Sequence, residues 1–168
     1  MPKNDPLPVS EAMRFPIVAL HIFDPASLAL AAAREHGVHH FPVFDREHLV
    51  GVVCTCDLQE AKLEQPVGDL MRPPVTIQDS GFATDAARLM LAADVGSVIV
   101  TGSDGTPRGI VTRSDLDGEP RAAALLEDCR CEACGSMRHL RRYQQRRLCF
   151  SCRERAVEPQ AFETGGGD

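Results

Sequence analysis

Five of the seven cysteines gather near the C-terminal end of the chain, between Cys129 and Cys152. Four of them form two Cys-x-x-Cys pairs, Cys131 with Cys134 and Cys149 with Cys152, and the segment 135–148 separates the pairs. Two such pairs can complete a tetrahedron around Zn²⁺ at Zn–S distances of about 2.3 Å. The spacing predicts a structural zinc site through these cysteines, with Cys129 as a spare thiol. Four protein ligands leave no open position for water, which argues against a catalytic zinc.

The alternative for the same residues is a set of unliganded thiols in a disordered tail. The segment also holds Leu140, Tyr143, Leu148 and Phe150, and so short a segment has no other means of burying them. Metal binding contributes about 10–16 kcal/mol in isolated zinc fingers. We therefore expect folding of this finger and metal binding to be one event.

The charge of the chain is divided unevenly. Residues 1–128 carry 10 basic and 19 acidic side chains, whereas residues 129–155 carry 8 arginines against Glu132 and Glu154. Five arginines flank Tyr143 in the finger: Arg138, Arg141, Arg142, Arg146 and Arg147. Such a cluster can neutralise nucleic-acid phosphates, or it can dock against the acidic body or a neighbouring subunit. The sequence leaves both alternatives open.

The first two thirds of the chain repeats itself at a nearly constant offset. PVSEAMRFPIV (8–18) corresponds to PVGDLMRPPVT (66–76), and GVVCTCDL (51–58) corresponds to GIVTRSDL (109–116). The matching stretches recur in the same order, which indicates a tandem repeat of one supersecondary unit.

Each unit is expected to run strand–helix–strand–strand–helix. In the first unit the strands are expected at 17–20, 40–44 and 49–54, with helices at 27–36 and 55–64. In the second they are expected at 75–77, 97–100 and 108–112, with helices at 82–93 and 112–128. One unit of this size cannot bury all its apolar faces alone, so two units are expected to pack together.

This pattern resembles a pair of cystathionine-β-synthase (CBS) domains, also called a Bateman module. The resemblance rests on VSEAM (9–13), VGDLM (67–71), FPVFD (41–45) and the two glycine-led stretches above. It implies an α/β fold (of α+β type) in which two repeats pack with pseudo-two-fold symmetry, plus the small C-terminal zinc ribbon. The expected organisation is a tail at 1–7, repeats at 8–65 and 66–120, a helix and finger at 121–156 and a disordered tail at 157–168.

The resemblance also implies that an adenosine ligand binds in a cleft between the repeats. In the glycine–apolar–apolar–Thr–x–x–Asp pattern of that family, the aspartate holds the ribose and the threonine reaches phosphate. The candidate residues of the second repeat are Thr112, Asp115, Arg113, Ser97, Val98 and Val75. Those of the first repeat are Asp57, His40 and Phe41. Because Cys54 stands where the pattern has threonine, and a thiol is a weak donor, we expect one competent site and one poor or empty site.

Simpler roles compete for some of these residues. Asp57, Ser114 and Asp115 can instead cap a helix, which stabilises it by about 1 kcal/mol each. The histidines His36, His39 and His40 are expected to form an incidental helix-end turn rather than line the cleft or bind metal. Cys54 and Cys56 flank a single residue, so one is expected to point into the core, without redox chemistry.

The finger resembles the four-cysteine finger of the DksA/TraR family, which acts on bacterial RNA polymerase. Its loop is shorter, however, and the acidic-tipped coiled coil of that family is absent from the sequence. That mode of action is therefore not expected here, and a generic zinc ribbon describes the segment equally well.

The sequence thus predicts a non-enzymatic regulator. Its CBS pair is expected to bind AMP, ADP, ATP, S-adenosylmethionine or a related ligand, and its zinc finger to contact nucleic acid or a protein. The alternative is a structural scaffold with a vestigial ligand site. We expect a cytoplasmic protein, because no stretch reaches the roughly 18 apolar residues of a membrane span and the start of the chain lacks the pattern of a signal peptide. The resemblance to CBS pairs further implies a homodimer.

Overall fold

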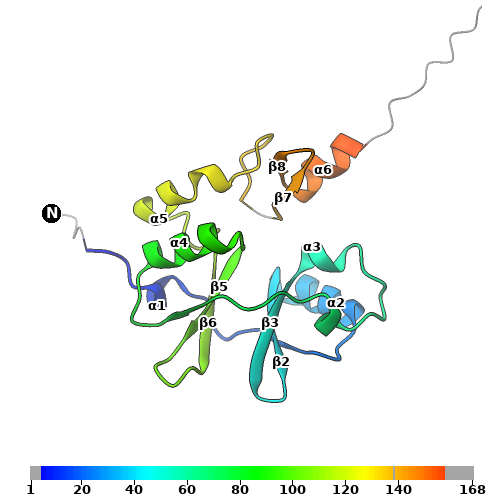
Figure 1. Cartoon of the computed structure of the whole chain (residues 1–168), viewed down its shortest axis with the longest axis horizontal. Helices are drawn as coiled ribbons and strands as arrows, with labels where there is room; N and C mark the ends of the chain where they lie inside the picture. Colours follow the sequence, from blue (N-terminus) through cyan, green and yellow to red (C-terminus); the bar gives the residue numbers. More distant parts are fainter. Residues whose placement is uncertain (1–4, 138, 158–168) are drawn as a thin grey trace, which may run out of the picture.

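A computed structural model describes residues 5–137 and 139–157 of the 168-residue chain (Figure 1). Arg138 and residues 158–168, nearly all of the expected C-terminal tail, lie outside the described residues. Among the helices of the described part, none combines the length and apolar character required to cross a bilayer.

The two repeats have the expected order of elements. The first contains β1 (Leu20–His21), α2 (Ala26–His36), β2 (His40–Asp45), β3 (His48–Cys54) and α3 (Thr55–Leu58). The second contains β4 (Thr76–Gln78), α4 (Ala83–Ala93), β5 (Ser97–Thr101), β6 (Pro107–Thr112) and α5 (Pro120–Leu125). Each forms a three-stranded sheet in which the first strand pairs parallel and the third antiparallel to the middle strand.

Three expected elements differ from the structure. The first closing helix, expected at 55–64, spans only Thr55–Leu58. The first strand begins at Leu20 rather than residue 17, because the pairing with β2 begins only there. Ile17 and Val18 line a cavity instead. The second closing helix starts only at Pro120, because Pro occupies its first turn and the Glu119 carboxylate accepts the Ala122 N–H at 2.6 Å. Residues 113–118 form turns instead.

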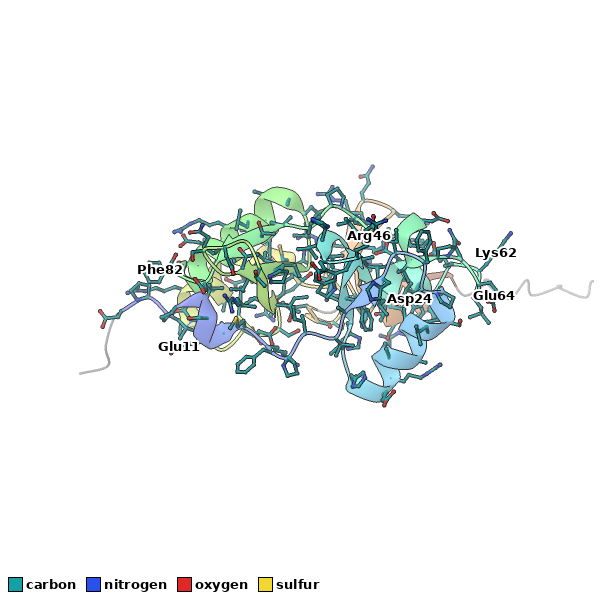
Figure 2. All side chains as sticks on the ribbon, turned by 90° about the horizontal axis from the view of Figure 1, so that it is seen from below. Glu11, Asp24, Arg46, Lys62, Glu64 and Phe82 are labelled. Carbon is teal, nitrogen blue, oxygen red and sulfur yellow. The ribbon has the colours of Figure 1, made fainter. Side chains whose placement is uncertain are left out.

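The leading segment of each repeat packs on the other repeat. The first (residues 7–14) includes α1 (Val9–Ala12) and the second (65–72) includes the 3₁₀ turn η1 (Val67–Asp69). Val9 is buried among the side chains of the second repeat, whereas Val67 is buried among those of the first. In Figure 2, Glu11 of the first leading segment lies near Phe82 of the second repeat, at the opposite end from Asp24 of the first repeat.

Backbone hydrogen bonds fix this crossing at matching positions. The Val9 N–H donates to Gly81 O at 2.9 Å, and the Val67 N–H donates to Asp24 O at 2.8 Å. Further along, Arg14 exchanges two backbone hydrogen bonds with Ile110, as Arg72 does with Val52. Because corresponding residues of the two copies make these contacts in both directions, the repeats pack with pseudo-two-fold symmetry.

The glycine that opens each GVV or GIV stretch makes room for the crossing segment. A Cβ on Gly51 would lie 2.5 Å from Met71 Sδ, and one on Gly109 would lie 2.6 Å from Met13 Sδ and 2.9 Å from Arg14 O. The glycines are thus required by the close approach of the opposite leading segment, rather than by a turn.

The C-terminal finger contains β7 (Arg141–Tyr143), β8 (Arg146–Leu148) and α6 (Phe150–Val157), and the 3₁₀ turn η2 (Glu127–Cys129) precedes it. β7 and β8 form an antiparallel hairpin. In Figure 1 the finger lies over the two repeats, beside α4 and α3. Its small core contains Leu148 and three of the cysteines, with Leu140 and Tyr143 packed against them.

We predict that Gly109→Ala destabilises the protein by about 1–3 kcal/mol, because the added methyl group overpacks the crossing. Gly118→Ala is the matched control: a Cβ there meets no described atom within 4 Å, and its effect is expected within about 0.5 kcal/mol. Urea unfolding followed by circular dichroism measures both. Equal stability of the two variants would contradict the crossing.

Candidate functional site

A cavity of ≈ 460 Å³ lies between the two repeats, with the finger forming part of its wall. This volume falls in the range of small-molecule sites. The first repeat contributes Val18, His39 and Val52, the second contributes Val95 and Ile110, and the finger contributes Met137, His139 and Leu140.

Most of the ligand-binding candidates line this cavity. From the second repeat it receives Val75, Ser97, Thr112 and Arg113, and from the first His40 and Asp57. Val98 and Phe41 are instead fully buried in the cores of their repeats. Asp115 does not line the cavity, but its carboxylate accepts a hydrogen bond from the hydroxyl of Thr112, which does line it.

Asp115 is held by the groups around it. Its Oδ2 accepts the Thr112 N–H at 2.8 Å and the Thr112 hydroxyl at 2.6 Å, and its Oδ1 pairs with Arg14. Because residues 113–118 are turns, the helix-capping alternative is wrong for Ser114 and Asp115: no helix begins there. The carboxylate instead closes a turn and fixes the Thr112 hydroxyl beside the cavity.

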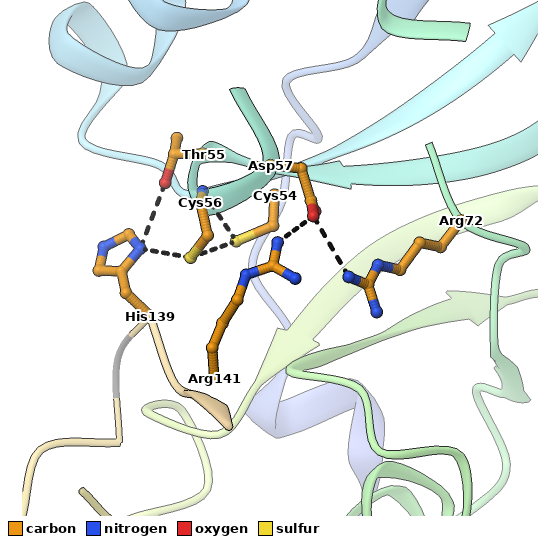
Figure 3. A network of polar contacts seen from close by, with 7 residues as sticks. All are labelled: Cys54, Thr55, Cys56, Asp57, Arg72, His139 and Arg141. Carbon is orange, nitrogen blue, oxygen red and sulfur yellow. Dashed lines mark hydrogen bonds and ion pairs between the residues drawn. The ribbon is translucent and has the colours of Figure 1, made fainter. Parts of the chain in front are cut away.

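Asp57 occupies the equivalent position in the first repeat and is likewise paired. It contacts Arg72 at 3.3 Å and also pairs with Arg141 of the finger (Figure 3). Sequence reasoning missed Arg14 and Arg72 as site residues. The signal was available, because each arginine follows the methionine of its leading segment and so stands at the same place in both copies.

Arg113 is a nearly buried cation at the cavity. Its side chain donates from Nη2 to Val95 O at 2.9 Å, while only 6% of the residue is exposed. Among the described residues, its Nε has no hydrogen-bond partner. Desolvation lowers the pKa of its guanidinium. A buried unpartnered donor is costly, and an anionic acceptor would relieve this cost.

The charged side chains at the cavity are mainly positive. Within the described part of the chain, Asp57 and Asp94 line it together with six arginines: Arg14, Arg72, Arg113, Arg141, Arg142 and Arg147. This excess of fixed positive charge inside a concave site favours an anionic ligand.

The histidine expectation is wrong for two of the three residues. The helix α2 ends at His36, and Gly37 follows in the left-handed conformation. His40 then begins β2, and both His39 and His40 line the cavity. The His39 ring also meets the finger's His139 edge-on, with centroids 4.5 Å apart.

The expectation that one cysteine of the Cys-x-Cys stretch is buried holds for Cys56, whereas Cys54 is half-buried. Both also line the cavity. Sequence reasoning missed His139, which approaches them from the finger. No local pattern marks this contact, since the partners lie in different domains and far apart in the chain.

The four predicted zinc ligands lie together. The Sγ atoms of Cys131, Cys134, Cys149 and Cys152 are all within 4.8 Å of one another, a set that could hold a metal ion. Gly135 follows the first pair at φ 74°, as a tight turn requires. The spare Cys129 is buried against the core of the second repeat and stands outside this group.

The backbone of the finger favours thiolate at one of these positions. Burial raises the pKa of the Cys131 thiol, but N–H groups of Cys149, Ala133 and Cys134 outweigh it and bring the pKa to about 6. Burial raises the pKa of Cys149 to about 12. A thiolate is the form that binds metal, so the N–H groups around Cys131 favour the form of this thiol that a metal ion needs.

The finger arginines make contacts within the chain. Arg141 pairs with Asp57, and Arg147 lies 3.9 Å from Asp94. Arg146 lies 3.4 Å from Glu132 inside the finger, whereas Arg142 lines the cavity. Arg141 and Arg147 thus contact acidic side chains of the two repeats, as the docking alternative expects. Nucleic-acid binding stays a prediction.

Two duplicated α/β units with exchanged leading segments and a cleft between them define a tandem-domain module. The family profile of the CBS domain matches residues 9–64 and 67–119. This chain therefore belongs to the CBS-domain family, and the finger lies outside the matched residues.

Known proteins support this assignment. A CBS domain-containing protein of Dictyostelium discoideum is 29% identical in an alignment of 126 positions that covers 64% of this chain and 87% of that protein. The solved CBS domain of a bacterial CNNM/CorC family Mg²⁺ transporter in complex with ATP is 27% identical, with a TM-score of 0.60 over 66% of this chain and 84% of that one. CBSX2 in complex with AMP is 31% identical, with a TM-score of 0.57 over 71% and 98%.

For the four-cysteine cluster we predict that Cys149→Ser/Cys152→Ser, or treatment with a chelator, makes residues 130–157 sensitive to protease. Losing the metal removes the free energy that orders so small a core. Limited proteolysis with mass spectrometry locates the cleavage. Cys129→Ser serves as control and is expected to keep the finger resistant, whereas a cleavage pattern unaffected by chelator would show that the cluster folds without metal.

Proposed function

We propose that this protein is a non-enzymatic regulator whose CBS pair binds an adenine nucleotide, or another anionic adenosine-containing ligand, in the cavity between the repeats. The observation that carries this proposal is the lining of the cavity, where the described residues include six arginines against two aspartates. Arg113 matters most, because its Nε is buried at this site without an acceptor among the described residues.

The second repeat offers the better ligand site. Thr112 and Arg113 stand together at the cavity and can bind phosphate, while Ser97 and Val75 can frame the base. The Asp115 carboxylate becomes available to a ribose once Arg14, whose side chain is 61% exposed, turns away. The relatives solved with ATP and with AMP support a nucleotide as the ligand class.

The first repeat offers the poorer site. Cys54 replaces the threonine, and Asp57 is engaged by two arginines rather than one. One of these, Arg141, belongs to the finger. In this proposal the finger occupies the ligand position of the first repeat and senses a ligand bound at the second.

The finger is proposed to bind Zn²⁺ through its four cysteines and to contact nucleic acid or a protein partner. Its arginines supply the charge for such a contact, and those now paired with Asp57 and Asp94 become available if the finger leaves the body. We also propose that the protein acts in the cytoplasm as a homodimer.

A scaffold without a ligand is the second candidate. It is favoured by one observation: both repeat aspartates already have arginine partners within the chain. In that case the arginines of the cavity serve only to hold the repeats and the finger together.

We predict that ATP, ADP or AMP raises the melting temperature of the full-length protein, and that Arg113→Met abolishes the rise. A ligand at about 100 times its Kd stabilises the native state by about 2.7 kcal/mol. Arg108→Met is the matched control, because Arg108 lies on β6, the strand that ends just before Arg113, is exposed and pairs with Asp104 away from the cavity. No rise with any adenosine ligand, S-adenosylmethionine included, would favour the scaffold.

A further inference from the structure

A second group of metal-binding side chains lies where the finger meets the first repeat. Cys54 Sγ is 3.2 Å from Cys56 Sγ, and Cys56 Sγ is 3.1 Å from His139 Nδ1 (Figure 3). The three candidate ligand atoms all lie within 4.8 Å of one another. None of these three residues belongs to the four-cysteine cluster.

The local fold directs these side chains to one point. Cys54 ends β3 and Cys56 lies in the first turn of α3, where the Cys56 N–H donates to Cys54 Sγ at 3.4 Å. His139 precedes β7 and has a positive φ of 53°, a conformation that non-glycine residues seldom adopt. Its ring nitrogen also lies 3.3 Å from the Thr55 hydroxyl.

A neighbouring ion pair holds the two elements together. Arg141, which begins β7 just after His139, pairs with Asp57, the residue after Cys56. The loop before β7 is therefore attached to the β3–α3 junction at two adjacent points, one ionic and one formed by the thiols and the imidazole.

Two thiolates and an imidazole form a donor set that suits zinc. In a tetrahedron with Zn–S distances of about 2.3 Å, two sulfurs lie roughly 3.8 Å apart. The observed separation of 3.2 Å reaches this value by small rotations of the side chains. Three protein ligands leave a fourth position open, and all three residues line the cavity.

We propose that Cys54, Cys56 and His139 bind a second Zn²⁺ ion, which joins the finger to the first repeat at the edge of the cavity. The fourth position is filled by water or by an anionic group of a bound ligand. This site assigns a role to Cys54 that differs from that of Thr112, its counterpart in the second repeat. The proposal does not depend on nucleotide binding.

The test is the zinc content of the full-length protein, purified under reducing conditions with Zn²⁺ and then desalted. We expect two zinc ions per chain in the natural protein and one in His139→Asn and in Cys54→Ser/Cys56→Ser. His36→Asn and Cys129→Ser are the matched controls and are expected to retain two. A single zinc in the natural protein, or a second zinc that survives both test variants, would overturn the proposal.

Alkylation keeps the test valid if the double cysteine variant folds poorly. Zn²⁺ is expected to protect Cys54 and Cys56 from alkylation by iodoacetamide in the natural protein but not in His139→Asn. Peptide mass spectrometry measures the alkylation of each cysteine. Equal alkylation with and without Zn²⁺ in the natural protein, or a disulfide between Cys54 and Cys56 that persists in reductant, would contradict the site.

Discussion

The exchange of leading segments between the repeats is the constraint on which the rest of the structure depends. Each repeat lacks part of its own core and receives it from the other, through Val9 in one direction and Val67 in the other. The same segments deliver Arg14 to Asp115 and Arg72 to Asp57. Because these contacts cross the molecule, the two repeats form one folding unit, and the residues that line the cleft are placed by both.

The duplication leaves two equivalent positions whose surroundings differ. In the second repeat, the Thr112 hydroxyl and Arg113 stand at the open cavity. In the first repeat, the finger's Arg141 meets Asp57 and its His139 meets Cys56. Cys54, which stands where the second repeat has Thr112, lies beside Cys56 at this contact with the finger. One cleft consequently contacts all three parts of the chain.

The sequence predicts the order of elements and the four-cysteine cluster well, because both depend on the spacing of residues that are close together in the chain. It overestimates the second closing helix, where Pro120 marks the start that the helical pattern of residues 112–128 obscured. It misses the exchanged segments and His139, because these contacts join residues far apart in the chain. Arg14 and Arg72 could have been found from the sequence, because an arginine follows the methionine of the leading segment in both copies.

We propose that one cavity, bounded by both repeats and the finger, binds an anionic adenosine ligand. Hydrogen–deuterium exchange of the zinc-loaded protein with and without ATP tests it most directly. Ligand binding is expected to slow exchange at residues 95–98 and 112–114 and to alter exchange at residues 139–142, segments that contribute to the cavity wall. Unchanged exchange in these segments, or protection confined to the outer faces of α2 and α4, would contradict it.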